Sequence, residues 1–233
     1  MNIYTYFNKI TTDNGSRFDN QDLMIDIWTK NWKSMGYNPI VLNIEHAKSH
    51  KYYNELIAKC KLIHMQLVKK PINRYGLSCF VRWLAYATQS DDKMIVSDYD
   101  IINNNWRDVK LMDKLHIMGS GPTPCFASGS PRQFEQLARL FVELTEKNIS
   151  NNTYIKNGPV WHDQNAIRGN IHDFPKDFIH FSDTMDSWVR DNWRDQPLIH
   201  VSHWFTTTYK KHYKKSGDVC DIRIELMKEL SSV

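Results

Sequence analysis

The order of hydrophobic segments in the first 44 residues constrains the fold most. Asn2–Phe7 is a β-branched and aromatic run that predicts a strand. Apolar residues at helical spacing between Met24 and Met35 predict a helix that Gly36 ends, and the apolar run Pro39–Ile44 is typical of a strand buried on both faces. Strand, helix and strand in this order form a βαβ unit, so the sequence predicts an α/β fold around a mostly parallel sheet.

Later segments extend this pattern without an evident linker. Ser130-Pro-Arg-Gln133 combines the N-cap residue, first-turn proline and glutamine of a helix start. Periodicity predicts helices over Tyr53–Leu67, Leu77–Leu84 and Asp221–Leu230, and short apolar runs predict strands at Lys93–Ser97, Leu115–Gly119, Phe178–Phe181 and Leu198–Trp204. We therefore expect one domain.

Composition narrows the class of protein. The 30 Lys and Arg residues exceed the 26 Asp and Glu residues by only four, which excludes a protein that depends on strong attraction to polyanions. No stretch approaches the roughly 18 apolar residues of a membrane span, and the N-terminus lacks a signal-peptide pattern, so we expect a soluble, cytoplasmic protein. Four scattered cysteines without a C-x-x-C pair argue against a disulfide framework or a structural zinc site, and we expect them to be reduced packing residues.

Two carboxylates, Asp98 and Asp100, directly follow the predicted strand Lys93–Ser97. Residues i and i+2 of an extended segment point the same way, so both can face one divalent cation, and α/β sheets bind ligands at the carboxyl ends of their strands. We expect both side chains to face solvent in the free protein. The alternative is a solvated turn, because this spacing also arises by chance in an Asp-rich chain.

The residues around this pair are similar to those of a known family. Ser78-Cys-Phe-Val-Arg82-Trp-Leu-Ala-Tyr86, followed about ten residues later by Ile95-Val-Ser-Asp98-Tyr-Asp100, resembles the helix and strand of the DxD glycosyltransferases of the GT-A fold. The resemblance implies a Rossmann-like, mostly parallel sheet flanked by helices in a single domain over residues 1–233. It divides that domain into a nucleotide-sugar-binding half, residues 1–105, and an acceptor-facing half, residues 106–233.

The resemblance also implies a reaction and a metal. Enzymes of this kind, which transfer hexosyl or pentosyl groups, move a sugar from a nucleotide sugar to an acceptor hydroxyl with the help of Mn²⁺ or Mg²⁺, and we expect a UDP-linked donor. Asp98 would contact the sugar or ribose, Asp100 would bind the metal directly, and Arg82 would lie close to the sugar and phosphates of the donor. The alternative for Arg82 is an exposed or ion-paired helix residue, and for the chain a sugar-nucleotide or glycan-binding module without transfer activity.

Further candidates lie on both sides of this segment. Thr5, Tyr6 and Phe7 end the first predicted strand, where the resemblance implies contacts with the nucleotide base. Trp161-His162-Asp163-Gln164 resembles the family's acidic element beneath the transferred sugar, so Asp163 is the candidate base that takes the proton of the acceptor hydroxyl. The alternative for Asp163 is a helix N-cap.

Two histidines in the last predicted strand compete for the metal. Leu198-Ile-His200-Val-Ser-His203-Trp204 resembles the late strand whose histidine completes the metal coordination in this family. A spacing of three in a strand places the two side chains on opposite faces, and His200 shares its face with Ser202. We therefore expect His200 to be the third metal ligand, together with Asp98 and Asp100, and His203 to be a core or cleft residue.

The acceptor stays open between two classes. Lys210-Lys-His-Tyr-Lys-Lys215 can neutralise the diphosphate leaving group, which makes Lys210 a candidate donor-binding residue, or it can grip the phosphates of nucleic acid. The alternative is a solvated loop. Trp161 and Trp204 can stack on a sugar. Abundant Asn, Lys, Ile and Tyr are encoded by A+T-rich codons and indicate a viral, phage or low-G+C bacterial source. The acceptor is thus a glycan or, in a phage, hydroxymethylated cytosine of DNA.

Overall fold

A six-stranded sheet forms the centre of the computed structural model, which describes residues 1–9, 20–107, 113–119, 123–155, 160–182 and 192–231. Its strands follow the order β2-β1-β3-β6-β5-β7, and β6 alone runs antiparallel to its partners within these described ranges. The strands are β1 (Asn2–Tyr6), β2 (Asn38–Leu42), β3 (Met94–Ser97), β5 (Leu115–Ile117), β6 (Phe126–Gly129) and β7 (Ile179–Phe181). The predicted α/β architecture with a mostly parallel sheet is confirmed.

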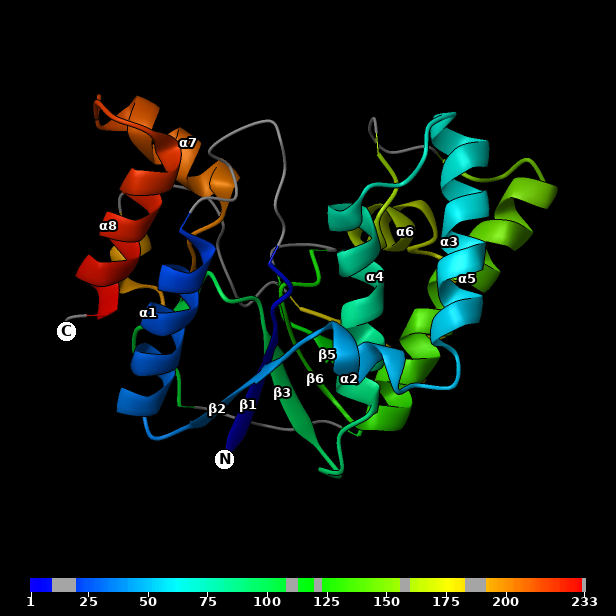
Figure 1. The fold of residues 1–233 in the computed structure, drawn as a ribbon, viewed down its shortest axis with the longest axis horizontal. Helices are drawn as coiled ribbons and strands as arrows, with labels where there is room; N and C mark the ends of the chain where they lie inside the picture. The colour runs from blue at the N-terminus through cyan, green and yellow to red at the C-terminus, as the bar shows by residue number, and fades with distance from the viewer. Residues whose placement is uncertain (10–19, 108–112, 120–122, 156–159, 183–191, 232–233) are drawn as a thin grey trace.

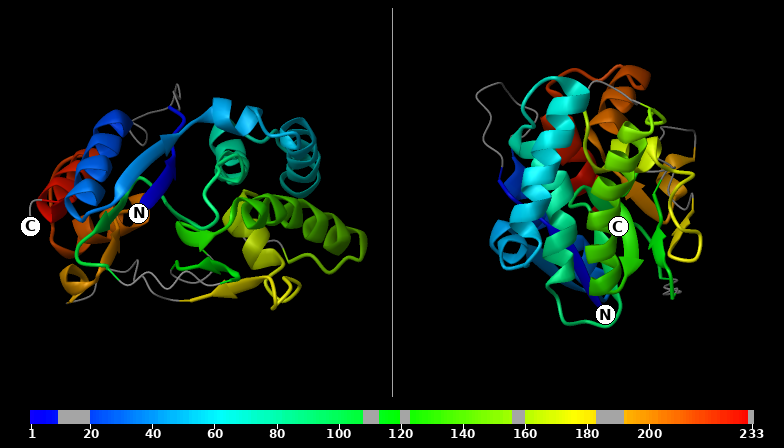
Figure 2. Two further views of the ribbon diagram at one scale, coloured as in Figure 1. Left: turned by 90° about the horizontal axis from the view of Figure 1, so that it is seen from below. Right: turned by 90° about the vertical axis from the view of Figure 1, so that its right-hand side faces the viewer.

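Helices gather in two groups beside this sheet (Figure 1). One group contains α1 (Gln21–Ser34), α7 (His203–His212) and α8 (Val219–Ser231). The other contains α2 (Ile44–Lys48), α3 (Tyr53–Val68), α4 (Arg74–Ala87), α5 (Pro131–Ser150) and α6 (Asp163–Gly169). Figure 2 shows the helices α3, α4 and α5 packed side by side, which agrees with their mutual contacts. The C-terminal helix α8 packs against α1, so the last helix of the chain contacts the first one.

The helix α4 positions the residues of the site because its two faces differ. Its N-cap, Asn73, accepts a hydrogen bond from the Gly76 amide at 2.8 Å. Phe80 on one face is fully buried and packs edge-to-face against Phe141 of α5, with ring centroids 5.8 Å apart. Burying each such ring contributes about 1.5–3 kcal/mol, which fixes α4 against α5 and leaves Arg82 directed toward the carboxyl ends of the strands.

The burial predicted for the second strand is wrong. The strand β2 lies at the edge of the sheet and is mostly half-exposed or exposed, with Val41 37% exposed. An apolar run alone does not distinguish a central strand from an edge strand. The run also ends earlier than predicted, because the Asn43 side chain caps α2, which begins at Ile44.

The segment Leu198–Trp204 is a strand only in its first half. The strand β8 (Leu198–His200) pairs with β4 (Ile101–Asn103) in a small antiparallel sheet that the sequence did not predict. Ser202 then caps α7 by accepting a hydrogen bond from the Phe205 amide at 3.1 Å. His203 therefore begins a helix and is not on the opposite face of a strand. Pairing of β8 with β4 also brings His200 next to the segment that contains Asp98 and Asp100.

Candidate active site

A pocket of about 570 Å³ opens where β1 and β3 end. In Figure 1 these strand ends lie between the two groups of helices. Its walls come from both helix groups and from the loops that follow β1, β3 and β8, as expected for ligand binding at the carboxyl ends of strands. The polar lining residues are Tyr6, Asn8, Gln21, Tyr75, Ser78, Cys79, Arg82, Asp98, Tyr99, Asp100, Thr123, Cys125, His162, Asp163, Gln164, Arg168, His200, Ser202, His203, Trp204 and Arg223.

Arg82 joins two of the predicted carboxylates. Its Nη2 donates to Asp163 Oδ2 at 2.6 Å and to the Pro124 carbonyl at 2.9 Å, while its Nη1 donates to Asp98 Oδ1. The Trp83 indole also donates to Asp163 Oδ2, at 3.1 Å. Arg82 is thus ion-paired, as the alternative interpretation of the sequence held, but it lies inside the pocket and not on the surface. One guanidinium serves two carboxylates on this side.

Asp100 has a separate set of partners. Nη2 of Arg223, from α8, donates to Asp100 Oδ2, and Nε of Arg223 donates to the Val201 carbonyl at 2.7 Å. His200 Nε2 lies 3.4 Å from Asp100 Oδ1. Asp100 is only 7% exposed, so the expectation that its side chain faces solvent is wrong. Its burial follows from these two cationic partners, without which a buried carboxylate would be very costly.

The two environments shift the carboxylate pKa values in opposite directions. Burial raises the pKa of Asp98 to about 6, and the nearby Asp100 charge adds to this rise while Arg82 opposes it. Burial also acts on Asp100, but His200 and Arg223 outweigh it and hold the pKa of Asp100 far below its usual range. Burial is likewise outweighed at Asp163, whose pKa is lowered by Arg82. Asp98 is therefore the carboxylate whose charge is least compensated.

The residues present fit a divalent cation. Ligand atoms of Asp98, Asp100 and His200 lie within 4.8 Å of one another, and two oxygens with one imidazole nitrogen suit Mn²⁺ or Mg²⁺. Burial lowers the pKa of His200, but Cys125 and Asp100 beside it raise that pKa well above its ordinary value. A metal at this position must therefore replace a proton on His200 and share Asp100 with Arg223, which pairs with Oδ2 while Oδ1 faces His200.

The residues predicted to contact the nucleotide base differ in their position and in their hydrogen-bonding groups. Tyr6 lines the pocket, and its buried hydroxyl has no hydrogen-bond partner in the described part of the chain. Thr5 is fully buried beneath it, and its hydroxyl likewise lacks a partner among the described residues. Phe7 packs edge-to-face on Tyr99, with centroids 5.6 Å apart. Tyr6 thus forms part of the pocket wall, Phe7 contacts the lining residue Tyr99 without lining the pocket itself, and Thr5 supports the strand from the core.

Other candidates are separated from this group. Lys210 is absent from the pocket lining and donates to the Gly217 carbonyl near the end of α7, so the lysine run begins in a helix and not in a loop. Trp161 is 1% exposed and packs on Phe80 in the core, so its predicted sugar-stacking role is wrong. Trp204 is 63% exposed at the pocket wall.

Sequence reasoning missed three lining residues that carry chemistry: Cys79, Cys125 and Arg223. The two cysteines were expected to be packing residues, yet Cys79 is only half-buried. Their partners are distant in sequence, and Arg223 lies 123 positions from Asp100. The single available signal for Arg223 was a positive charge within an amphipathic helix, which is ordinarily read as a solvated position.

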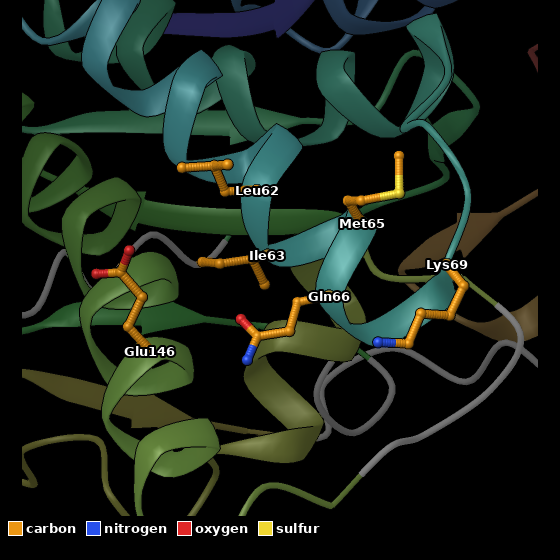
Figure 3. Close-up of a pocket in the computed structure, with 6 residues that line it drawn as sticks. All are labelled: Leu62, Ile63, Met65, Gln66, Lys69 and Glu146. Atoms are coloured by element: carbon orange, nitrogen blue, oxygen red, sulfur yellow. The ribbon is translucent and has the colours of Figure 1, made fainter.

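A second hollow lies between α3 and α5, with Leu62, Ile63 and Met65 on its walls (Figure 3). Its ionic lining groups are Lys69, which follows the end of α3, and Glu146 of α5. It lacks the converging carboxylates of the first pocket. In the described ranges no helix is both long enough and apolar enough to cross a membrane.

Comparison with known proteins establishes the fold. No protein-family model matches the sequence, and no curated protein is similar to it in sequence. The structure of the galactosyltransferase LgtC, solved with donor and acceptor sugar analogues, is similar over 100% of this chain and 95% of LgtC, with a TM-score of 0.50 and 12% identity. The glycosyltransferase GlyE of Streptococcus pneumoniae TIGR4 gives TM-scores of 0.46 and 0.43 for two crystal structures, at 13% identity, over 99% of this chain and 64% of GlyE. The chain has the GT-A glycosyltransferase fold, as its sequence predicts.

Proposed function

We propose that this protein is a glycosyltransferase that moves a sugar from a UDP-linked nucleotide sugar to an acceptor hydroxyl. One observation carries the proposal: Asp98, Asp100 and His200 converge at the end of β3, inside a pocket that Arg82 also lines. Two carboxylates at close range are costly unless a cation joins them, and the Asp100 charge adds to the rise in the pKa of Asp98 that burial causes. The GT-A fold supports this assignment by analogy.

The donor would occupy the half of the chain formed by residues 1–105. Tyr6 and Phe7 at the end of β1 would contact the base, with the unpartnered Tyr6 hydroxyl offering a hydrogen bond and Thr5 supporting the strand. Residues 106–233 would face the acceptor, where the exposed ring of Trp204 provides a surface for stacking. Pockets of this kind combine apolar walls with a few polar groups that orient the ligand.

Mn²⁺ or Mg²⁺ would be held by Asp98, Asp100 and His200, and when bound it would offset the charge that grows on the diphosphate as the sugar leaves. Asp100 Oδ1, which faces His200, would bind the metal, and the charge of the metal would weaken the pairing of Arg223 with Oδ2. The guanidinium of Arg223 would then be available for a phosphate oxygen, for which its planar group of donors is well suited. Arg82, anchored on Asp163, would contact the sugar or phosphates from the opposite wall.

Asp163 is the proposed catalytic carboxylate. Its Oδ2 is engaged by Arg82 and Trp83, and its Oδ1 accepts a hydrogen bond from the Gln164 amide at 2.8 Å. Because its pKa is lowered, Asp163 is ionised at neutral pH and accepts hydrogen bonds from sugar hydroxyls readily, but it is a weak proton acceptor. We therefore propose that it binds and orients the sugar, with proton removal from the acceptor as the alternative.

The proposed acceptor is a glycan, and hydroxymethylcytosine of phage DNA is the second candidate. The observation that favours DNA is the row of lysines at positions 210, 211, 214 and 215, which lies at the end of the helix that begins at the pocket wall. Retention on hydroxymethylated duplex at low salt, with a salt slope that falls when the four lysines are changed to Ala, would support DNA. Absence of retention at low salt would exclude it and leave Lys210 as a solvated residue.

The proposed activity can be tested by UDP release. A panel of UDP-sugars is incubated with the protein with and without Mn²⁺, and free UDP is measured, with Asp98→Asn as the matched variant. We expect release from at least one donor that requires Mn²⁺ and is lost in Asp98→Asn. Binding of UDP-sugar by calorimetry without any release would favour a binding module, and neither binding nor release across the panel would contradict the proposed function.

A further inference from the structure

A second group of metal-binding atoms lies beside Asp163. Cys79 comes from α4, and His162 and Asp163 come from the start of α6. Their ligand atoms all lie within 4.8 Å of one another, and His162 Nδ1 is 3.5 Å from Asp163 Oδ1. These residues share no atom with the group formed by Asp98, Asp100 and His200. The pair of groups thus gives the pocket two separate places where a cation has three ligands.

The spacing of this group is close to that of a tetrahedral metal site. Zinc binds thiolate at about 2.3 Å and imidazole or carboxylate at about 2.0–2.2 Å, which sets neighbouring ligand atoms roughly 3.3–3.8 Å apart. The separation between His162 and Asp163 already falls in that range. The remaining separations are at most 4.8 Å, so they require closure of about 1.5 Å or less. Such closure is within reach of a side chain rotation at Cys79, which is only half-buried.

His162 supplies an independent sign of an absent ligand. Its Nδ1 is buried, lies too far from Asp163 for a good hydrogen bond, and has no other hydrogen-bond partner in the described part of the chain. Buried polar atoms are normally satisfied, so this nitrogen requires an explanation. A metal ion would satisfy it.

The hydrogen-bond partners of Asp163 fix its orientation, as the partners of a metal-binding carboxylate do. Arg82 and Trp83 occupy Oδ2, so that Oδ1 is the oxygen that faces His162. Partners of this kind fix the orientation of a ligating carboxylate. The backbone amide of Gln164 donates a hydrogen bond to Asp163 Oδ1, and this bond leaves a second lone pair of that oxygen available for a metal.

Cys79 decides the kind of metal. A sulfur, nitrogen and oxygen set favours thiophilic ions such as Zn²⁺, whereas Asp98, Asp100 and His200 form a harder set suited to Mn²⁺ or Mg²⁺. A nucleophilic role for the cysteine does not fit, because burial and the adjacent Asp163 charge raise the pKa of its thiol. A bound metal, in contrast, would deprotonate the thiol outright.

We propose that Cys79, His162 and Asp163 form a second metal site that binds Zn²⁺ or a similar thiophilic divalent ion, with its fourth position open to the pocket. Binding releases the thiol proton of Cys79 to solvent and forms one metal bond to each of the three side chains. Because the site uses Asp163, its occupation blocks the sugar position proposed above. That consequence rests on the proposed function, whereas metal binding does not.

Cobalt spectroscopy of the full chain tests the site directly. Co²⁺ bound by a thiolate gives a charge-transfer absorption in the near ultraviolet that oxygen and nitrogen ligands do not give. We expect this band in the wild-type protein, its loss in Cys79→Ser and its displacement by Zn²⁺. Cys125→Ser is the matched control, because Cys125 lines the same pocket but contacts His200, and it should keep the band.

Three results would overturn the proposal: no cobalt–thiolate band in wild type, a band that survives Cys79→Ser, or a band lost in Cys125→Ser. His162→Ala gives a second route if Cys79→Ser does not fold, and it should weaken zinc binding at least about tenfold. Zinc inhibition of Mn²⁺-dependent UDP release should also disappear in Cys79→Ser. A cobalt band without any UDP release would leave the metal site standing and remove the proposed function alone.

Discussion

Asp98 and Asp100 are two residues apart, yet their surroundings are opposite. Asp98 shares the single guanidinium of Arg82 with Asp163, and its pKa is raised by burial. Asp100 has Arg223 and His200 beside it, and these hold its pKa low. A symmetrical motif in sequence is therefore asymmetrical in structure. The comparison teaches that Asp98 is the carboxylate that gains most from an added cation, while Asp100 already contributes to the stability of the folded chain.

The largest expected difference concerns stability. Asp100→Ala leaves Arg223 buried without its carboxylate and should lower the free energy of unfolding by about 3–5 kcal/mol. Asp98→Ala leaves Arg82 still paired with Asp163 and should cost about 1 kcal/mol or less. Urea unfolding of both variants in metal-free buffer measures the difference. Adding Arg223→Met to Asp100→Ala should recover part of the lost stability. Equal destabilisation by the two alanine variants would contradict the proposed difference between Asp98 and Asp100.

The second prediction concerns Asp163, the partner that shares Arg82 with Asp98. Asp163→Asn removes the charge that would orient the sugar but keeps an acceptor for Arg82 and Trp83, so we expect UDP binding to persist while UDP release falls by roughly 10²-fold. Calorimetry and the release assay measure these separately. Asp177→Asn, an exposed residue outside the pocket lining, is the control. Unchanged release would return Asp163 to a structural role.

The third prediction concerns competition at Asp100. Arg223 places its positive charge against Asp100, so Arg223→Met should tighten Mn²⁺ binding about tenfold even though it destabilises the metal-free protein. Isothermal calorimetry with Mn²⁺ measures the affinity, and thermal unfolding with and without Mn²⁺ measures the stability. Weaker Mn²⁺ binding in Arg223→Met would show that Arg223 holds Asp100 in place for the metal and does not compete with it.

The smallest expected effect is the pH dependence of stability. Because the folded pKa of Asp98 is raised to about 6, its ionisation opposes folding, and the stability that its protonated form contributes is lost as pH rises toward and past 6. Asp98→Asn should therefore raise the unfolding temperature by a few degrees at pH 7 and by less at pH 4. The pKa of Asp100 is lowered, so Asp100→Asn should be destabilising at pH 7 and less so at low pH. Parallel pH profiles for the two variants would contradict the comparison.

Local patterns sufficed for much of the fold. The helix α5 begins with the capping box that Ser130 and Gln133 predict, and Gly36, with φ of 85°, ends the turn after α1 as expected. The pairing of β8 with β4 and the antiparallel course of β6 were not predictable, because three-residue and four-residue strands have no distinctive period and pair with distant partners. The edge position of β2 depends in the same way on strand order and not on its own residues.

The residues of the candidate site that belong to short sequence motifs were predictable from the sequence. Asp98 and Asp100 follow from the end of a strand, Arg82 and His200 follow from the resemblance of their segments to a known family, and all four line the same pocket. Arg223 and Cys79 have no local signal that distinguishes them from a solvated or a packing residue, since their importance depends on side chains brought near by folding. The buried state of Asp100 was missed for this reason: without Arg223, a carboxylate after a strand is expected to face water.

The most direct test of the central claim is calorimetric titration of UDP into the metal-free protein and into the protein with Mn²⁺, in wild type and Asp98→Asn. Asp98→Asn is chosen because it should leave the fold intact. The proposed site predicts that wild type binds UDP strongly only with Mn²⁺ and that Asp98→Asn loses this dependence. Equal UDP binding with and without Mn²⁺, or Mn²⁺-dependent binding unchanged in Asp98→Asn, would contradict it.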